Sequence, residues 1–424
     1  MTLGSRLARG LMPLILLTPL VAHAELPPVP ASAGQHFTLG QLERLTLQNN
    51  PAIQAARHDE EAAEARTRTA RALPNPDIEY LAGNASPRAG GTVTGTARSY
   101  GLSLPLDTPW RRLPRIATAD AGLDAARQQR RAFEADVIAE LRQRFYDVLR
   151  REAELKNALE DQRLTEDIRA RIKARVDIGE AGRFELIKAD AEALNARQLA
   201  EAASRRAVQA RTVLQRVSGL SLPTSFQLNG RLDDIPGLRA LDDLSNELQV
   251  RSPDLLRARA EVERASQSLR LERGLRWPAL SLKGTIEEEP DVKFNRIGLS
   301  ATLPIFDQRQ GPVDEARAQL ARAQRQLQQA DLVLTQGLIA AVQQYEIAAA
   351  RVTALETGIL RQTEAALNVA QIAYRHGERS FLDVLDAQRV HRAARNDLIA
   401  ARTELATAWI EIERLRAAHG ETPE

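Results

Sequence analysis

The chain has 424 residues, of which 43% are hydrophobic, 27% charged and only 4% aromatic, and it contains no cysteine. Without cysteine it cannot be a disulfide-stapled scaffold, a cysteine-ligated metalloprotein or a thiol enzyme. Its 58 basic and 56 acidic side chains give a net charge of +2, so no nucleic-acid partner is expected from its charge.

The N-terminus has the order of parts found in secretory signal peptides. Arg6 and Arg9 precede an apolar run over 11–21, which ends in the small-residue pattern Ala-His-Ala. We therefore expect a signal peptide over 1–24, followed by an extended, proline-rich segment over 25–37. No later segment approaches the about 20 consecutive apolar residues of a membrane-spanning helix. Because no cysteine is available for acylation, no lipid anchor is expected.

The mature chain contains an internal repeat. Asn50-Pro51 recurs as Ser252-Pro253 at an offset of 202 residues, and Gly179-Glu180 recurs as Gly377-Glu378 at 198. A period this long indicates duplication of a whole subdomain, because solenoid arrays repeat at much shorter intervals. The expected parts are a first repeat over 38–219, a linker over 220–240, a second repeat over 241–418 and a tail over 419–424.

Helical periodicity dominates both repeats. Leu320, Leu327 and Leu334 lie seven apart, which is the spacing of coiled coils. The longest expected helix has 65 residues and would be about 98 Å long, too long for one compact domain. A tall helical cylinder wall is therefore predicted, with helices over 38–73, 113–177 and 184–217 in the first repeat and 241–274, 313–375 and 381–418 in the second.

Two strands are expected in each repeat. Within 294–305, Ile297, Leu299 and Leu303 alternate with polar residues or glycine. Such alternation suits a membrane barrel strand with one face in lipid, and it suits a soluble sheet packed on helices equally well. The signal peptide and the long coiled coils favour the barrel. The expected strands lie near 78–84, 97–106, 279–287 and 294–305.

Trp110 follows the first pair of strands and Trp277 precedes the second, at the end from which the helices leave. Indole rings at this place fit an aromatic membrane-interface belt, although they could also be core residues. Four strands cannot close a barrel, and an open edge is not tolerated in lipid. A sheet in the membrane would therefore require the chain to oligomerise.

A specific motif now suggests a family. Residues 374–387 read YRHGERSFLDVLDA, and together with the duplication and the order of elements they resemble the TolC-like outer membrane efflux factors. The resemblance covers essentially the whole mature chain. It is strongest to the outer membrane members of heavy-metal export systems of the cobalt-zinc-cadmium or copper-silver kind.

The resemblance implies a mostly α-helical chain with a small antiparallel β part and a two-fold internal repeat. Three copies would form a homotrimer with a 12-stranded β-barrel in the outer membrane of a Gram-negative bacterium, continued by a long periplasmic α-helical coiled-coil barrel. The implied partners are outer membrane lipid, a periplasmic adaptor (membrane fusion) protein and an inner membrane pump of the resistance-nodulation-division class.

The resemblance also implies a periplasmic gate. Asp383 and Asp386 match the acidic positions that form rings in the family, and they lie three apart on one helical face. Repeated around a threefold axis, such rings concentrate cations. Without the resemblance, both residues would be read as ordinary solvated charges near a helix terminus.

Further residues match positions that hold the family's gate closed. Tyr374 and Arg379 match the restraining positions, and Glu185 lies where the family has an acidic partner. Lys188 departs from the pattern, because it occupies the first-repeat position equivalent to Asp386, where it could pair with the acidic ring. The tips of the two repeats would turn at Gly179 and Gly377.

No catalytic, cofactor or metal site is expected. The histidines are scattered, none pairs with another at a spacing of four, and there is no cysteine. His376 lies in the expected tip turn, where a residue without a specific function is the simpler interpretation. The chain is therefore interpreted as a passive conduit and not an enzyme. A periplasmic coiled-coil adaptor or scaffold without a barrel remains as the alternative, and a secreted enzyme with a helical shell is disfavoured for want of a catalytic constellation.

Overall fold

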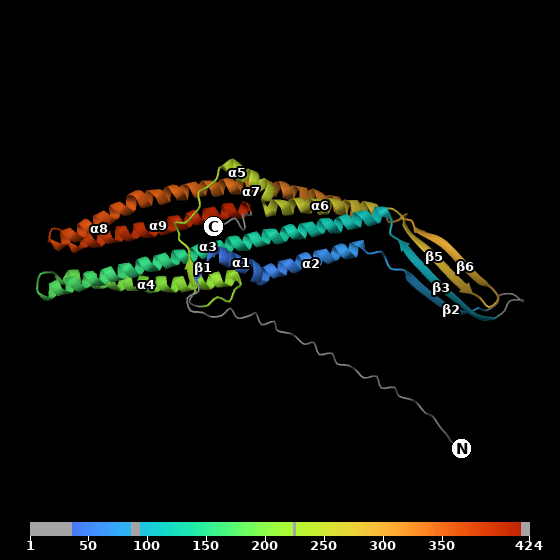
Figure 1. Ribbon diagram of the computed structural model, residues 1–424, viewed down its shortest axis with the longest axis horizontal. Helices are drawn as coiled ribbons and strands as arrows, with labels where there is room; N and C mark the ends of the chain where they lie inside the picture. Colours follow the sequence, from blue (N-terminus) through green and yellow to red (C-terminus); the bar gives the residue numbers. More distant parts are fainter. Residues whose placement is uncertain (1–35, 86–93, 224–225, 417–424) are drawn as a thin grey trace, which may run out of the picture.

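The structure is a computed structural model, and it describes residues 36–85, 94–223 and 226–416. The expected signal peptide, nearly all of the extended segment, most of the first strand–strand loop and the expected C-terminal tail lie outside this part of the chain. The described chain is elongated, with helices along most of its length and a sheet at one end (Figure 1). A mostly helical chain with a small antiparallel sheet was predicted, and this is confirmed.

The same order of elements occurs in both halves of the chain. The first half contains α1 Leu39–Asn49, α2 Pro51–Arg71, β2 Asp77–Ala85, β3 Gly95–Leu106, α3 Pro109–Asp177 and α4 Arg183–Ser218. The second half contains α5 Leu241–Arg251, α6 Pro253–Gly274, β5 Ala279–Glu288, β6 Lys293–Thr302, α7 Gln310–Ala354, a π-helical turn η1 Leu355–Ile359, α8 Leu360–Arg375 and α9 Phe381–Arg416.

The first helix of each half is broken where a single helix was expected. Pro51 and Pro253 each open a new helix, because proline lacks the N–H of a helix interior and disfavours helical backbone in the residue before it. Asn50 caps α2, since its Oδ1 accepts from the N–H of Ala52 at 2.8 Å. Its Nδ2 donates to the carbonyl of Val217 on α4 at 3.0 Å. The prediction of unbroken helices over 38–73 and 241–274 was therefore wrong.

The two long helices differ from each other. Helix α3 has 69 residues and begins at Pro109, four residues earlier than expected, with Pro114 inside its first turns. At 1.5 Å per residue it is about 104 Å long. Its counterpart in the second half runs without a gap from α7 through η1 to α8, so the helix predicted over 313–375 is present, with one irregularity at the π-helical turn η1 that was not predicted.

The linker between the halves includes a short strand. Strand β4, Gln227–Asn229, pairs in parallel with β1, His36–Thr38, which lies at the end of the expected extended segment. Phe226 and Phe37 meet edge to face with ring centroids 6.4 Å apart. Both are buried in the largest hydrophobic cluster, which also contains Phe145 of α3. The linker is thus packed onto the first half and α9.

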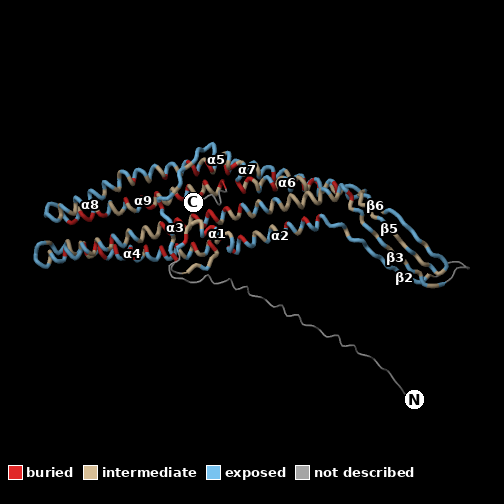
Figure 2. The backbone as a smooth tube through the Cα atoms, in the orientation of Figure 1, coloured by how far each residue is buried: buried red, intermediate tan, exposed pale blue. Residues whose placement is uncertain are grey.

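Buried residues follow the seams between helices, and the four-stranded sheet has none (Figure 2). Its strands are antiparallel in the order β2-β3-β5-β6, so β2 and β6 are its edges. Strand β6 ends at Thr302, three residues earlier than expected. None of the described helices has both the length and the apolar character needed to cross a membrane.

Candidate functional site

The turns at the tips of the two halves have the same backbone geometry. Gly179 and Gly377 have φ values of 79° and 77°, in the left-handed region that glycine adopts readily. After each glycine, a glutamate N–H closes a bond to the carbonyl five residues back, at 2.8 Å for Glu180 and 2.9 Å for Glu378. This is the Schellman motif, which ends α3 and α8 sharply and lets α4 and α9 return beside them.

Tyr374 joins the two tips. Its hydroxyl donates to Oε2 of Glu185 on α4 at 3.5 Å, and its ring lies 6.0 Å from that of Phe381. The guanidinium of Arg175 lies 5.3 Å from the centre of the same ring. Burial, followed by the neighbouring Glu185 carboxylate, raises the pKa of Tyr374 further above neutral pH.

The other two expected restraint residues, Arg379 and Lys188, do not contact Tyr374 or Glu185 among the contacts of the described residues. Arg379 is exposed in the turn between α8 and α9. The arginine that the structure places on Tyr374 is Arg175, in the last turn of α3, and nothing in the sequence pattern distinguished it. The ammonium of Lys188 lies 5.1 Å from the ring centre of Phe184, one turn earlier on the same helix.

The two tip aspartates differ in their surroundings. Asp383 forms a reciprocal cap with Ser380: its Oδ2 accepts from the Ser380 backbone N–H and from the hydroxyl, both at 3.0 Å. The Asp383 N–H donates back to the Ser380 Oγ at 3.4 Å. This is the arrangement of a capping box, with an aspartate in place of the usual glutamate. Asp386 is exposed on the same helix.

Packing beneath the tip fixes which face of α9 is turned outward. Phe381 and Leu385 are buried against Ile172 of α3 and Ala189 of α4. Asp386 directly follows Leu385 and therefore points away from this cluster, because successive helical residues are about 100° apart. No group of three or more histidine, aspartate and glutamate side chains able to hold a metal ion occurs among the described residues.

The two faces of the sheet differ in polarity. Opposed residues share a face, so the register places Ile78, Leu102, Leu282 and Leu299 on the same side. Their side chains are between 44% and 84% exposed. This apolar face also carries Tyr80, Tyr100, Leu104, Leu106, Leu280, Ile286 and Ile297, and the opposite face carries Asp77, Glu79, Ser99, Ser103, Ser281, Lys283, Thr285, Arg296 and Ser300.

The apolar face is bounded along the strands. Beyond Tyr100 and Ile286, the next opposed pair on this face is Arg98 and Glu288, and Glu288 also bonds Lys293 at 2.7 Å. From Leu106 to Tyr100 the strand rises about 20 Å. The face is therefore an apolar band that ends in charged residues near the loops.

Trp110 and Trp277 lie together at the other end of the band. Their ring centroids are 6.4 Å apart, and they are 38% and 60% exposed. Nη2 of Arg111 donates to the Trp277 carbonyl at 2.9 Å. Gly274, at the end of α6, lies so close to the start of α3 that a Cβ on it would be 2.1 Å from the Trp110 carbonyl oxygen.

Some exposed apolar residues also form stripes along the helices. On α4, Ile187, Leu194 and Val208 are 59–66% exposed and separated by seven and fourteen residues, so they follow one coiled-coil face. On α8, Val369 and Ile372 are 66% and 50% exposed. Apolar stripes of this kind mark surfaces that contact other molecules.

Comparisons with known proteins agree with this geometry. The sequence profile of the outer membrane efflux protein family matches residues 42–220 and 244–419. The chain is 29% identical over 398 residues to the cobalt-zinc-cadmium resistance protein CzcC of Cupriavidus metallidurans, covering 92% of each chain. It is 25% identical to the nickel-cobalt-cadmium resistance protein NccC of Alcaligenes xylosoxydans xylosoxydans, covering 75% of this chain and 70% of that one.

A crystal structure of CusC, a protein described as forming a transmembrane channel, superposes with a TM-score of 0.75 at 20% identity, covering 89% of this chain and 91% of that one. The fold is therefore shared with that protein. Together with the family match over both halves, this confirms the resemblance found in the sequence. The chain belongs to the outer membrane efflux protein family.

Proposed function

We propose that the chain forms a passive homotrimeric channel across the outer membrane, continued through the periplasm by its helices. The observation that carries this proposal is the sheet: it has no buried residue on either face, and one face is an apolar band. A soluble sheet buries one face against the rest of its domain. A face with about 20 Å of exposed apolar side chains is instead suited to lipid, and the opposite polar face to a water-filled lumen.

Three protomers would satisfy the surfaces that one protomer leaves open. The edges β2 and β6 would pair between neighbours and give a closed barrel of 12 strands, as lipid requires. The stripes on α4 and α8 would pack between protomers as coiled-coil seams. Trp110 and Trp277 would lie at the periplasmic interface of the membrane, where indole rings are favoured.

Heavy-metal cations are the proposed cargo. Support comes from the names of two relatives, which are resistance proteins for cobalt, zinc and cadmium and for nickel, cobalt and cadmium. As the resemblance to the TolC-like efflux factors implies, energy and most of the selection would come from an inner membrane resistance-nodulation-division pump and a periplasmic adaptor.

The tip would act as the periplasmic gate. The contact of Tyr374 with Glu185 would hold the two halves of the tip together. Asp386, exposed on the face away from the tip cluster, would supply the cation-selective ring. Asp383 would contribute less to selectivity, since its carboxylate is partly buried and engaged in the Ser380 cap, whereas that of Asp386 is exposed.

Fractionation followed by conductance measurement tests the proposal. The full-length protein should be recovered in the outer membrane as a heat-labile trimer and should form cation-selective channels in planar bilayers. Asp386→Asn should lower the selectivity for cations more than Asp383→Asn does. Recovery in the soluble periplasmic fraction without detergent would support the coiled-coil scaffold instead, and unchanged selectivity in the double variant would remove the ring assignment.

A further inference from the structure

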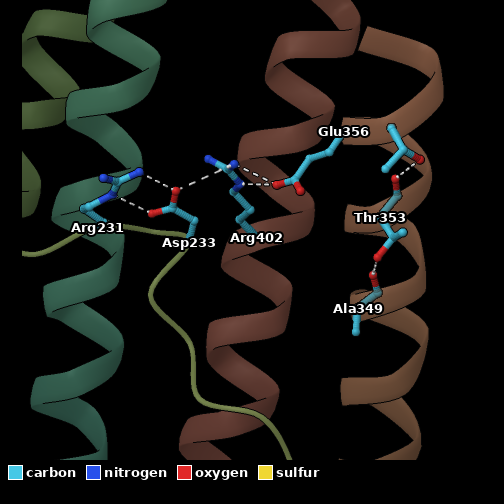
Figure 3. A network of polar contacts seen from close by, with 7 residues as sticks. Arg231, Asp233, Ala349, Thr353, Glu356 and Arg402 are labelled. Carbon is cyan, nitrogen blue, oxygen red and sulfur yellow. Dashed lines mark hydrogen bonds and ion pairs between the residues drawn. The ribbon is translucent and has the colours of Figure 1, made fainter. Parts of the chain in front are cut away.

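The π-helical turn η1 is a local irregularity in an otherwise continuous helix. The N–H of Leu360 bonds the carbonyl of Leu355, five residues back, where an α-helix would use four. Nearby, the hydroxyls of Thr353 and Thr357 donate to carbonyls four residues earlier, at 3.0 and 2.7 Å (Figure 3). A Cβ on Gly358 would meet no atom within 4 Å. Insertions of this kind and hydroxyls bonded to the backbone are recognised places where helices bend.

An ion-pair chain holds this turn from the side. Glu356, within η1, accepts from Arg402 of α9 through one carboxylate oxygen, at 2.7 Å from Nη2 and 3.0 Å from Nε. The same Nη2 lies 4.0 Å from Asp233 of the linker. Asp233 is in turn held by Arg231 at 2.7 and 2.9 Å (Figure 3).

The far end of this chain of contacts is fixed to the largest hydrophobic cluster, which joins the first half of the protein to α9. Leu232, next to Asp233, is buried in the largest hydrophobic cluster together with Phe226 and Phe145. On the other side, Leu355 of the turn packs on Leu398 and Ala401 of α9. The contacts therefore connect a well-packed body to the part of the α7–α8 helix that is most easily bent.

We propose that η1 is the pivot of α8, and that Asp233, Arg402 and Glu356 form a latch that holds α8 in the orientation seen here. Tyr374 lies 15 residues beyond Ile359, so the lever is about 22 Å long. A bend of about 10° at the pivot would move Tyr374 by about 4 Å, which is enough to end its 3.5 Å contact with Glu185. The effect on conduction rests on the gate of the proposed function, whereas the motion itself does not.

A second ion pair provides a matched control. Arg351 of α7 bonds Glu404 of α9 at 2.9 Å. It joins the same helical assembly just before η1, but it belongs to neither the turn nor the linker contacts. Glu404→Gln should therefore leave α8 in place, whereas Glu356→Gln and Asp233→Asn should each release it.

Spin-label distances test the latch directly, since a chain without cysteine accepts labels only where cysteines are introduced. One pair joins the tips at Ile178→Cys and His376→Cys. A reference pair lies on the other side of the pivot, at Asp59→Cys on α2 and Gln324→Cys on α7. Distances are measured within single protomers of the full-length protein, diluted with unlabelled chains.

Glu356→Gln and Asp233→Asn should increase the population with separated tips about threefold, the size of effect expected for a partly exposed ion pair. The reference distance should not change, and Glu404→Gln should alter neither distance. Tip distances that stay the same in both latch variants, or that change equally in the control, would overturn the proposal. If three tips open together, the open probability in bilayers should rise about thirtyfold, the cube of the single effect.

These distances do not depend on conduction. A wild-type protein that fails to form channels would contradict the proposed function while the tip distances still decide whether η1 is a latched pivot. If the wild-type protein conducts but the latch variants leave the tip distances unchanged, only the proposal of a latched pivot is overturned.

Discussion

Replacing Leu102 by arginine tests the assignment of the two sheet faces. Leu102 is at the middle of the apolar band, opposite Ile78 on one neighbouring strand and Gly284 on the other. An arginine facing lipid near the membrane midplane costs about 2–4 kcal/mol. A trimer would carry three of them, at a total of about 6–12 kcal/mol, which is similar to the whole stability of many folded proteins.

The matched control lies one residue further along the strand. Ser103 is on the polar face, opposite Asp77 and Lys283, so an arginine there would stay in water beside one opposite and one like charge. Ser103→Arg should leave the amount of heat-labile trimer in the outer membrane fraction near the wild-type level, whereas Leu102→Arg should nearly abolish it. Normal assembly of Leu102→Arg, or equal damage from both substitutions, would refute the assignment of the faces.

Two further predictions concern charged groups of the helical part. Arg142 is only 2% exposed, and Glu43→Gln removes its partner, so this substitution should lower the free energy of unfolding by about 3–5 kcal/mol. Glu140→Gln, at an exposed ion pair, should change the free energy of unfolding by less than about 1 kcal/mol. Equal effects of the two substitutions in denaturant titrations would contradict this. The hydrogen bond from Arg130 lowers the pKa of Glu60 in the folded protein, against the opposing effect of burial. Glu60 therefore stabilises the fold at pH values above its ordinary pKa of 4.5. This stabilisation is lost as the pH falls through the lower pKa of the folded state. The drop in unfolding temperature between neutral pH and about pH 3 should therefore be smaller in Glu60→Gln, and an undiminished drop would show that Glu60 contributes nothing to it.

The types of most elements could be predicted from the sequence. Residues of the heptad pattern lie at the contacts between helices, and alternating residues lie on opposite faces of the sheet. The helix breaks were not predicted, although their signals were present. Asn50-Pro51 and Ser252-Pro253 mark the repeat in the sequence, and the same prolines also require a new helix start.

The π-helical turn was harder to foresee, since no proline marks it. Leu334, Ala341, Ala348 and Leu355 are buried at intervals of seven, and the pattern reads smoothly to this point. The next buried residue of the helix is Leu367, twelve positions later, so the phase of the seam shifts after Leu355.

At the tip, the sequence pattern does not distinguish the roles of neighbouring charged residues. A pair of aspartates three apart fits both an acidic ring and a helix cap, and only the hydrogen bonds of Ser380 distinguish Asp383 from Asp386. Likewise, the contact of Arg175 with Tyr374 joins α3 to α8 across about 200 residues of sequence, and no local pattern encodes a contact between distant elements.

The exposed apolar surfaces of the protomer indicate that folding and assembly are coupled. The described sheet has no buried residue on either face, and one of its faces is the apolar band. Exposed apolar side chains also lie along α4 and α8. The chain as a whole is hydrophilic, with a mean hydropathy of −0.34, since the band occupies only one face of four strands. In the proposed trimer, the other surfaces would face neighbouring protomers and water in the tunnel. An isolated protomer would leave all of these surfaces in water, so its stability should depend on protein concentration and on lipid or detergent.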